Sequence, residues 1–257
     1  MSRIIYKIIE FFIRLVYHIE AVGAENLPDE PCIIVGNHTQ INGPLACELY
    51  FPVKRRTWCA GQMMELKEVP AYAFQDFWSF KPKWTHPFYR ILSYLIAPLA
   101  VVLFNNAETI PVWRDMRLMT TFRRTMDSLD EGTSVVIFPE QNVKYNNILY
   151  DFQDRFIDTA RFYYKRAKKE LCFVPLYVAP ALGKMYIGKP IRFDHTAKIE
   201  DERRRICDYL MNEITSIAAS LPEHTVVPYR NIPKRLYPKN RPIIMYKDDI
   251  SNEKTDS

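Results

Sequence analysis

Residues 31–46 place the strongest constraint on the fold. Residues 32–35 form a continuous apolar run rich in β-branched side chains, which is typical of a buried strand, and Pro44 suits the first turn of a helix that begins at Leu45. His38 therefore lies on the turn that leaves the carboxyl end of a core strand, where ligands bind in open α/β sheets. An imidazole, with an ordinary pKa of about 6.5, exchanges protons near neutral pH. His38 is a candidate catalytic base, although a loop histidine that fills space has the same pattern.

Composition narrows the class of protein. The chain has 257 residues, of which 48% are hydrophobic, enough for one α/β domain with a sizeable core. A net charge of +5 suits an anionic membrane surface or a phosphate-bearing ligand, and no nucleic-acid-binding motif is present. The cysteines are odd in number and scattered, and we expect them to be reduced in a cytosolic protein; they are Cys32, Cys47, Cys59, Cys172 and Cys207. The first residues do not have the pattern of a cleaved signal peptide.

Residues 1–18 predict an amphipathic helix that associates with a membrane. Its charged residues share one stripe, and the remaining circumference is apolar and aromatic; the stripe contains Arg3, Lys7, Glu10 and Arg14. A bilayer span needs about 20 predominantly apolar residues, so this pattern favours a helix that lies in the membrane interface. Packing against the protein's own core is the alternative.

The segment from residue 52 to residue 104 is harder to interpret. Residues 52–86 have no regular pattern and combine aromatic with basic residues, a composition typical of a membrane-interface belt or of a lid over an apolar pocket. Residues 87–104 are the most apolar run of the chain. Because Arg90, Ser93 and Pro98 interrupt it, we expect a buried or re-entrant pair of helices rather than a span.

The remaining pattern alternates helices with strands, as in α/β folds. The predicted strands or extended segments are 20–23, 108–114, 134–138, 171–178 and 184–190, and the predicted helices are 45–51, 116–129, 152–169 and 200–221. We expect one domain over residues 19–221, followed by a Pro-rich tail, 222–257, that is basic and then acidic and is either wrapped or disordered. Glu140 directly follows a core strand, as His38 does. It is therefore the second candidate residue of the site.

Four short blocks, in order, resemble those of the phospholipid/glycerol acyltransferases of the lysophosphatidate acyltransferase type. The blocks are Asn37-His38 with Pro44, Ile110-Pro-Val-Trp-Arg114, Phe138-Pro139-Glu140 and Val174-Pro175-Leu176. The resemblance covers roughly residues 20–195. It implies a single-domain glycerol-phosphate-acyltransferase-like α/β fold, in which helices flank a mixed, mostly parallel sheet.

The resemblance also implies an activity. The family transfers a fatty acyl group from acyl-CoA or acyl-carrier-protein, as cosubstrate, to the hydroxyl of a lysophospholipid or glycerol-phosphate-like acceptor, with no other cofactor and no metal. In this chain His38 would be the general base and Arg114 would bind the acceptor's phosphate, with Lys144, Gln141 and Asn37 nearby. Such an enzyme of phospholipid biosynthesis or remodelling is expected at the cytoplasmic face of a membrane, as a peripheral protein.

Two departures from the family pattern concern the site. Gly43 stands where the family has the aspartate that orients the histidine, and residues 141–143 replace Gly-Thr-Arg. In serine proteases, loss of the orienting carboxylate's charge costs about 10⁴ in rate. The candidate substitutes are Asn42 and Glu140, and below them Glu48.

Other nucleophiles and ligands have less support. Cys47 lies in an apolar helix without a cation beside it, which predicts an inert thiol. His86 and His195 have no partners at metal-ligand spacing in the sequence. Two alternative functions remain open, a lipid-binding pseudoenzyme that keeps the acyl groove without turnover and an acyl-thioester hydrolase in which His38 activates water.

Overall fold

The computed structural model describes residues 2–113 and 115–241, which form two compact units. Unit 1 comprises Met1–His18 and Cys47–Val136, and unit 2 comprises Ile19–Ala46 and the chain from Ile137 onward. Both units combine segments that are distant in the sequence. No single position in the sequence therefore separates the two units. The sequence predicted one domain over residues 19–221.

Unit 1 contains a parallel three-stranded arrangement. β3 (Arg55–Ala60) pairs in parallel with β4 (Thr109–Val112) on one side and with β5 (Ser134–Ile137) on the other. α5 (Leu118–Asp130) precedes β5. The prediction that residues 52–86 are irregular is wrong for β3. Its first two residues are arginines, and Arg55 is tolerated there because its guanidinium pairs with Glu48 at 3.0 Å while its side chain is only 9% exposed.

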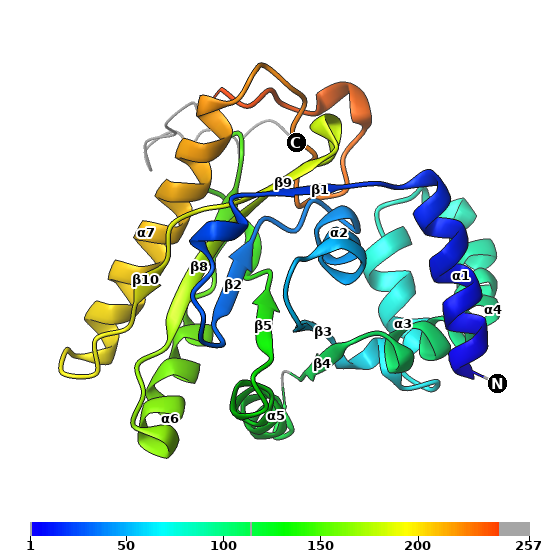
Figure 1. Ribbon diagram of the computed structural model, residues 1–257. Coiled ribbons are helices and arrows are strands. Elements are labelled where there is room, and N and C mark those ends of the chain that lie inside the picture. The colour runs from blue at the N-terminus through cyan, green and yellow to red at the C-terminus, as the bar shows by residue number, and fades with distance from the viewer. Residues whose placement is uncertain (1, 114, 242–257) are drawn as a thin grey trace. The chain divides into compact units, whose positions relative to one another are not determined.

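The helices of unit 1 include the longest apolar segment. Besides α5, they are α1 (Ser2–Val16), α3 (Val69–Ala73) and α4 (His86–Asn106), with shorter turns η2 (Gly61–Met64), η3 (Phe74–Trp78) and η4 (Lys83–Thr85). α4 continues through Pro98 as one helix, so the predicted helical pair is wrong. Its inner face consists of small buried residues, Ser93, Ala97 and Ala100, which lets it pack closely against α3 and η2. α1 packs alongside α4 (Figure 1).

Unit 2 contains the strands that carry the site. β1 (Glu20–Val22) and β9 (Lys184–Ile187) are parallel, as are β2 (Ile33–Gly36) and β8 (Cys172–Ala179). β8 also pairs antiparallel with β9 and with the short β10 (Ile191–Arg192). Every residue of β2 and β8 is buried, as expected for continuous apolar runs in an α/β sheet. The prediction of an α/β fold with a mostly parallel sheet flanked by helices is confirmed.

The other elements of unit 2 refine the predicted boundaries. They are α6 (Asp158–Ala167), α7 (Ile199–Ser220), the antiparallel pair β6 (Glu140–Lys144) and β7 (Tyr150–Phe152), and the turns η1 (Ala24–Asn26), η5 (Asp154–Ile157), η6 (Pro180–Leu182) and η7 (Lys234–Leu236). α2 (Asn42–Tyr50) belongs to unit 2 up to Ala46 and to unit 1 from Cys47, and it begins three residues before the predicted start. α6 begins later than predicted because β7 and η5 occupy residues 150–157. α7 packs against β8 (Figure 1), and its buried residues include Ile206, Leu210 and Ile214.

Residues 222–241, which we call the strap, follow α7 and wrap onto unit 2. The side chain of Asn240 donates to the carbonyls of Ala218, Leu221 and Pro222, and Thr225 pairs with Lys239 in an isolated antiparallel bridge. Of the two alternatives for the tail, this part is therefore wrapped. Residues 242–257 lie outside the described residues.

Candidate functional site

Two segments separated by 102 residues in the sequence meet at the carboxyl end of β2. The backbone N–H of His38 donates to Oε2 of Glu140 at 2.6 Å, and the N–H of Tyr150 donates to Oε1 of the same carboxyl at 2.9 Å. Both Glu140 oxygens thus bind main-chain donors. The carboxyl fixes the position of the His38 backbone, and its bonds are to amides rather than to the imidazole.

Asn37 joins the ends of β2 and β8. Its Oδ1 accepts from the N–H of Val178 at 2.7 Å, and its Nδ2 donates to the carbonyl of Val178 at 3.0 Å. The side chain is almost fully buried. The sequence placed Asn37 near the acceptor, but here its amide is used to hold two core strands together.

The turn after His38 has an unusual backbone. Thr39 and Gln40 have φ values of +45° and +56°, in the left-handed region that residues with a side chain rarely adopt. The carbonyl of Thr39 accepts from both the N–H and the side-chain amide of Asn42, at 3.1 and 2.9 Å. Backbone strain of this kind persists only where surrounding contacts enforce it.

His38 is half-buried, and two aromatic side chains contact its ring. Phe138 lies 5.4 Å from it and Tyr229 lies 5.8 Å from it, measured between ring centroids, and both contacts are edge-to-face. Its Nδ1 is buried and has no hydrogen-bond partner among the residues that the structure describes. Burial lowers the pKa of His38 to about 4, and the backbone of Gln40 acts in the opposite direction. The imidazole is therefore neutral at physiological pH, and nothing described orients it through Nδ1.

Glu140 shows the opposite shift. Its side chain is buried, and burial raises the pKa of Glu140 to about 7, against the two backbone N–H groups that favour the carboxylate. Near neutral pH this carboxyl is close to the midpoint of its titration. Perturbed titratable groups beside one another are typical of functional sites, although structural networks produce them as well.

The position of the family's aspartate has no space for a side chain. A Cβ on Gly43 would lie 2.6 Å from the carbonyl oxygen of His38, 2.8 Å from that of Asn37 and 2.9 Å from the ring of Phe138. The N–H of Gly43 also donates to the His38 carbonyl at 3.1 Å. The turn is therefore built around a glycine, and a carboxylate at this position would require the backbone to move.

The remaining acceptor-site candidates lie on or near β6. Gln141 donates to Asp151 on β7 at 2.9 Å, and Lys144 is exposed at the end of β6. Arg114, which the resemblance implied for phosphate binding, lies outside the described residues.

Glu48 and Cys47 have roles within unit 1. Glu48 accepts a hydrogen bond from the hydroxyl of Tyr6 and pairs with Arg55, so it attaches α1 to the rest of the unit. Burial raises the pKa of the Cys47 thiol to about 12, which agrees with the expectation of an inert thiol.

Among the described residues of unit 2, a group of potential metal ligands lies away from His38. Single ligand atoms of Glu170, Asp194 and His195 all lie within 4.8 Å of one another. Nδ1 of His195 is 2.6 Å from Glu170, and the His195 ring stacks on Tyr164. Sequence spacing did not reveal this group because Glu170 is distant from the other two. Exposed acidic groups with a histidine are common without a metal, and the hydrogen bond between His195 and Glu170 explains their contact.

The sequence did not reveal the residues that surround the His38 turn from the C-terminal side. Tyr229 contacts the His38 ring, and Gln40 donates to the hydroxyl of Tyr237 at 3.1 Å. Their separation from the turn by about 190 positions leaves no local signal. The only available indication was the aromatic content of an otherwise polar, Pro-rich tail.

Comparisons with known proteins give a likeness to solved structures. Neither models of protein families nor curated protein sequences match this chain. Among solved structures, it is similar to the 1-acyl-sn-glycerophosphate (LPA) acyltransferase PlsC from Thermotoga maritima, with 14% sequence identity, 86% of this chain and 83% of that chain covered, and a TM-score of 0.48. At this level the likeness assigns neither a family nor an activity.

Proposed function

We propose that this protein is a peripheral membrane acyltransferase, which transfers a fatty acyl group from acyl-CoA or acyl-carrier-protein to the hydroxyl of a lysophospholipid or glycerol-phosphate-like acceptor. The observation that carries the proposal is the 2.6 Å contact between the His38 backbone and Glu140. It brings together two of the four sequence blocks, and Asn37 ties the first of them to β8, which contains the fourth. Three blocks that resemble one family thus meet at one strand end.

The proposed chemistry uses His38 as general base. The imidazole removes the proton from the acceptor hydroxyl while the oxygen attacks the thioester carbonyl, the carbon–sulfur bond breaks, and the proton passes to the departing thiolate. A base of this kind contributes about 10²- to 10⁴-fold to the rate. It needs a neutral ring, which the low pKa of His38 provides. It also needs a fixed tautomer, for which Nδ1 must acquire a partner in the reacting state.

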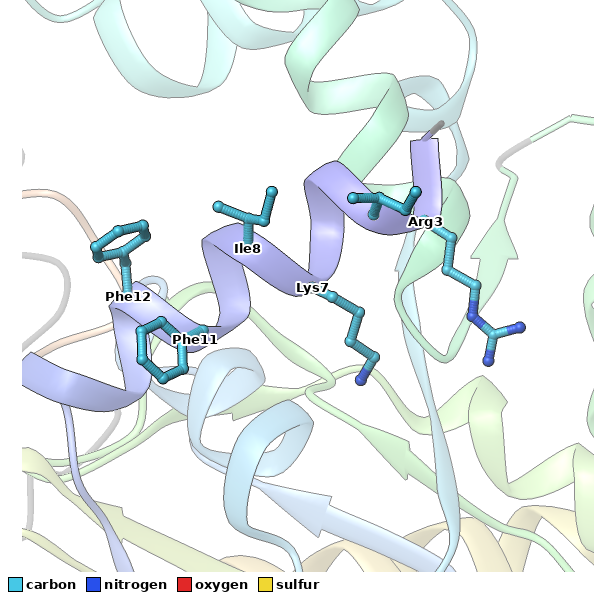
Figure 2. Close-up of a pocket in the computed structure, with 6 residues that line it drawn as sticks. Arg3, Lys7, Ile8, Phe11 and Phe12 are labelled. Carbon is cyan, nitrogen blue, oxygen red and sulfur yellow. The ribbon is translucent and has the colours of Figure 1, made fainter.

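The exposed face of α1 supports a membrane location. The helix contains no buried residue, and its large apolar side chains point outward; they are Ile4, Ile5, Ile8, Phe11, Phe12, Leu15 and Val16. Figure 2 shows Ile8 and Phe12 projecting from one side of α1, with Lys7 and Arg3 directed to another. An apolar face next to cationic side chains is the pattern of helices that insert into an anionic interface.

α4 exposes a second apolar stripe in the same unit. The stripe contains Phe88, Ile91, Tyr94, Leu95 and Leu99. Residues Lys83–Asn106 are long and apolar enough to cross a bilayer by length and composition, with 17% of that window buried. Because the inner face of α4 packs on α3 and η2, we place both helices in the membrane interface with their apolar sides toward the acyl chains. The proposed side of the membrane is the cytoplasmic one.

Activity is tested with the purified full chain, radiolabelled acyl-CoA or acyl-carrier-protein, and a panel of lysophospholipids and glycerol phosphates in vesicles. We expect acylated lipid, and we expect His38→Ala to reduce its formation at least about 100-fold. Undiminished product in that variant would remove His38 from the mechanism. Free fatty acid without acylated acceptor would replace the proposal with the hydrolase.

A lipid-binding pseudoenzyme is the second candidate, and two observations favour it. Gly43 leaves no room for the orienting carboxylate, and Nδ1 of His38 has no partner among the described residues. This candidate predicts that the protein retains acyl lipid through gel filtration while forming neither acylated lipid nor free fatty acid. The same radiolabel assay, followed by extraction of lipid from the protein fraction, distinguishes the acyltransferase from the pseudoenzyme.

A further inference from the structure

The middle of the strap lies directly on the His38 turn. Tyr229 contacts the ring of His38 and also that of Tyr150, with a centroid distance of 5.6 Å to the latter. The side-chain nitrogen of Gln40 donates to the carbonyl of Arg230 at 3.3 Å and to the hydroxyl of Tyr237 at 3.1 Å. Gln40, one of the two left-handed residues of the turn, is thus bonded to a segment from a distant part of the chain.

The two ends of the strap are held far more firmly than its middle. At the base, the N–H of His224 donates to Oδ1 of Asn240 at 3.0 Å, and the imidazole bonds to the hydroxyl of Tyr177 at 2.8 Å. His224, Asn240 and Tyr177 are all buried. Between these ends, residues 227–238 are mostly exposed or half-buried. Such a segment can open locally while its ends stay in place.

The turn beneath the strap carries the signs of a closed state. Nδ1 of His38 and the hydroxyl oxygen of Thr39 are both buried without a hydrogen-bond partner among the described residues. Unpaired buried polar atoms cost free energy, as does the left-handed backbone of Thr39 and Gln40. Contacts from the strap maintain this arrangement, and their loss would expose more of the half-buried ring to solvent and to new partners.

The outward side of the strap is cationic. Its exposed basic residues are Arg230, Lys234, Arg235, Lys239 and Arg241. Glu223 pairs with Lys239 at 3.8 Å, which leaves an excess of positive charge. In the short helical turn η7, Leu236 is 58% exposed next to Lys234 and Arg235. Cations beside an exposed apolar side chain fit the surface of an anionic membrane.

We infer that residues 227–238 form a cover over His38 and that an anionic lipid surface draws this cover away. Tyr229 and the contacts of Gln40 keep the cover closed in the absence of lipid. Binding of Lys234 and Arg235 to lipid headgroups would separate Tyr229 from the ring and release the strained turn. The inference rests on the proposed function only for what His38 does once uncovered, because the covering itself is independent of turnover.

The closed state is tested by the reactivity of His38 toward diethylpyrocarbonate, which modifies unprotonated imidazole and is quantified for each histidine by peptide mass spectrometry. Exposed His195 and buried His224 of the same chain are internal references. In lipid-free protein we expect His38 to react far more slowly than His195. Tyr229→Ala should accelerate modification of His38 about tenfold, because one aromatic contact and its buried area are lost.

Two hydroxyl deletions supply a matched comparison. Tyr237→Phe removes only the hydroxyl that Gln40 contacts, and we expect a smaller acceleration at His38, about threefold. Tyr209→Phe removes a hydroxyl on α7 that donates to the Lys189 carbonyl, and we expect no change. A His38 rate equal to that of His195 in the unmodified protein, or unaltered by Tyr229→Ala, would refute the cover. Unchanged slow reaction at His224 shows that the variants remain folded.

The lipid step is tested with vesicles of phosphatidylglycerol and, for comparison, phosphatidylcholine. Anionic vesicles should accelerate modification of His38 in the unmodified chain, and neutral vesicles should not. The double variant Lys234→Glu with Arg235→Glu should still float with anionic vesicles through α1 and α4 but lose the acceleration. Acceleration that persists in this variant, or that anionic vesicles fail to produce, would overturn the lipid step. The readout does not need acyl transfer, so a failed activity assay leaves it interpretable.

Discussion

The outer surface of α1 and α4 and the interior around His38 depart in opposite ways from an ordinary globular arrangement. In unit 1, large apolar side chains point outward, while the ion pair of Glu48 and Arg55 is mostly buried. In unit 2, the helix α7 buries its apolar residues in the usual way. The same unit contains the imidazole of His38 and the carboxyl of Glu140, whose pKa values are shifted by burial. The first departure fits an apolar medium outside the protein, and the second fits a chemical site inside it.

The two regions are under different kinds of constraint. Exposed apolar residues contribute little to the folding of unit 1, so changing them should affect what the protein binds. Polar groups inside unit 2 are held by many close contacts, so changing them should affect stability as well. Variants on the surface of α1 and α4 and in the interior around His38 test this contrast. We expect the largest effect at Gly43, where the interior has the least free space.

Gly43→Ala should destabilise the protein by about 3 kcal/mol or more, since the new Cβ would meet two backbone carbonyl oxygens below 3.0 Å. Gly43→Asp, which introduces the residue that the resembled family has at this position, should be at least as destabilising. The measurement is urea unfolding followed by far-UV circular dichroism. Gly132→Ala is the matched control, because a Cβ added there would have no atom within 4 Å and only the φ of +73° disfavours alanine, at about 1 kcal/mol. Equal effects at both positions would show that the His38 turn can relax.

Phe12→Ser together with Leu95→Ser should weaken binding to anionic vesicles about 100-fold. Each side chain is more than half exposed, and burying such a side chain in lipid is worth about 1.5–3 kcal/mol. The free energy of unfolding should change by no more than about 0.5 kcal/mol, because neither residue is part of the core. Binding is measured by flotation. Met116→Ser, at a position that is 98% exposed outside α1 and α4, should bind as well as the unmodified chain; an equal loss there would mean that exposed apolar area in general drives binding.

Glu140→Gln should change how stability depends on pH. Burial raises the folded pKa to about 7, so above the unfolded value of about 4.3 the folded state holds a proton that the unfolded state loses. The stability that Glu140 provides is therefore complete below about pH 4.3 and is lost as the pH rises through 7. Relative to the glutamine variant, the unmodified protein should lose about 3 kcal/mol between pH 4.5 and 8. His38 has the opposite sign, with stability lost as the pH falls toward 4, but it is present in both proteins and cancels in the difference. Parallel pH profiles would show that Glu140 titrates normally.

The elements that local pattern determines were predictable from the sequence. β2 and β8 are continuous apolar runs, and α7 has a helical period of buried residues, so their types and approximate limits follow from the residues. β3 was missed because its opening arginines look like a surface segment, and only the pairing of Arg55 with Glu48 makes them compatible with a strand. The single helix α4 was missed because a proline in its interior usually ends a helix.

The candidate site was predictable only in part. His38 and Glu140 both follow apolar strands, which was enough to predict that they lie together. Aligning His38 with the histidine of the resembled block showed that Gly43 stands where that block has its aspartate. The sequence could not show that Gly43 has no space for a side chain, because the obstruction comes partly from Phe138, far along the chain. Nor could it show Tyr229 over the imidazole, since a contact across 191 positions leaves no periodic trace.

The smallest effect is expected where α1 is attached to unit 1. With its apolar face directed outward, α1 depends on polar attachments, among them the bond from the Tyr6 hydroxyl to Glu48, which Arg55 holds in place. Tyr6→Phe removes that donor but leaves the ion pair, so the cost should be about 1 kcal/mol, confined to α1. We expect backbone amides of α1 to exchange with solvent about fivefold faster in lipid-free protein while those of α7 are unchanged. Tyr94→Phe, on the exposed stripe of α4, should leave exchange in both helices unaltered. If Tyr6→Phe also has no effect, the polar attachment is dispensable and the inner apolar residues of α1, such as Ile9 and Ile13, hold the helix by themselves.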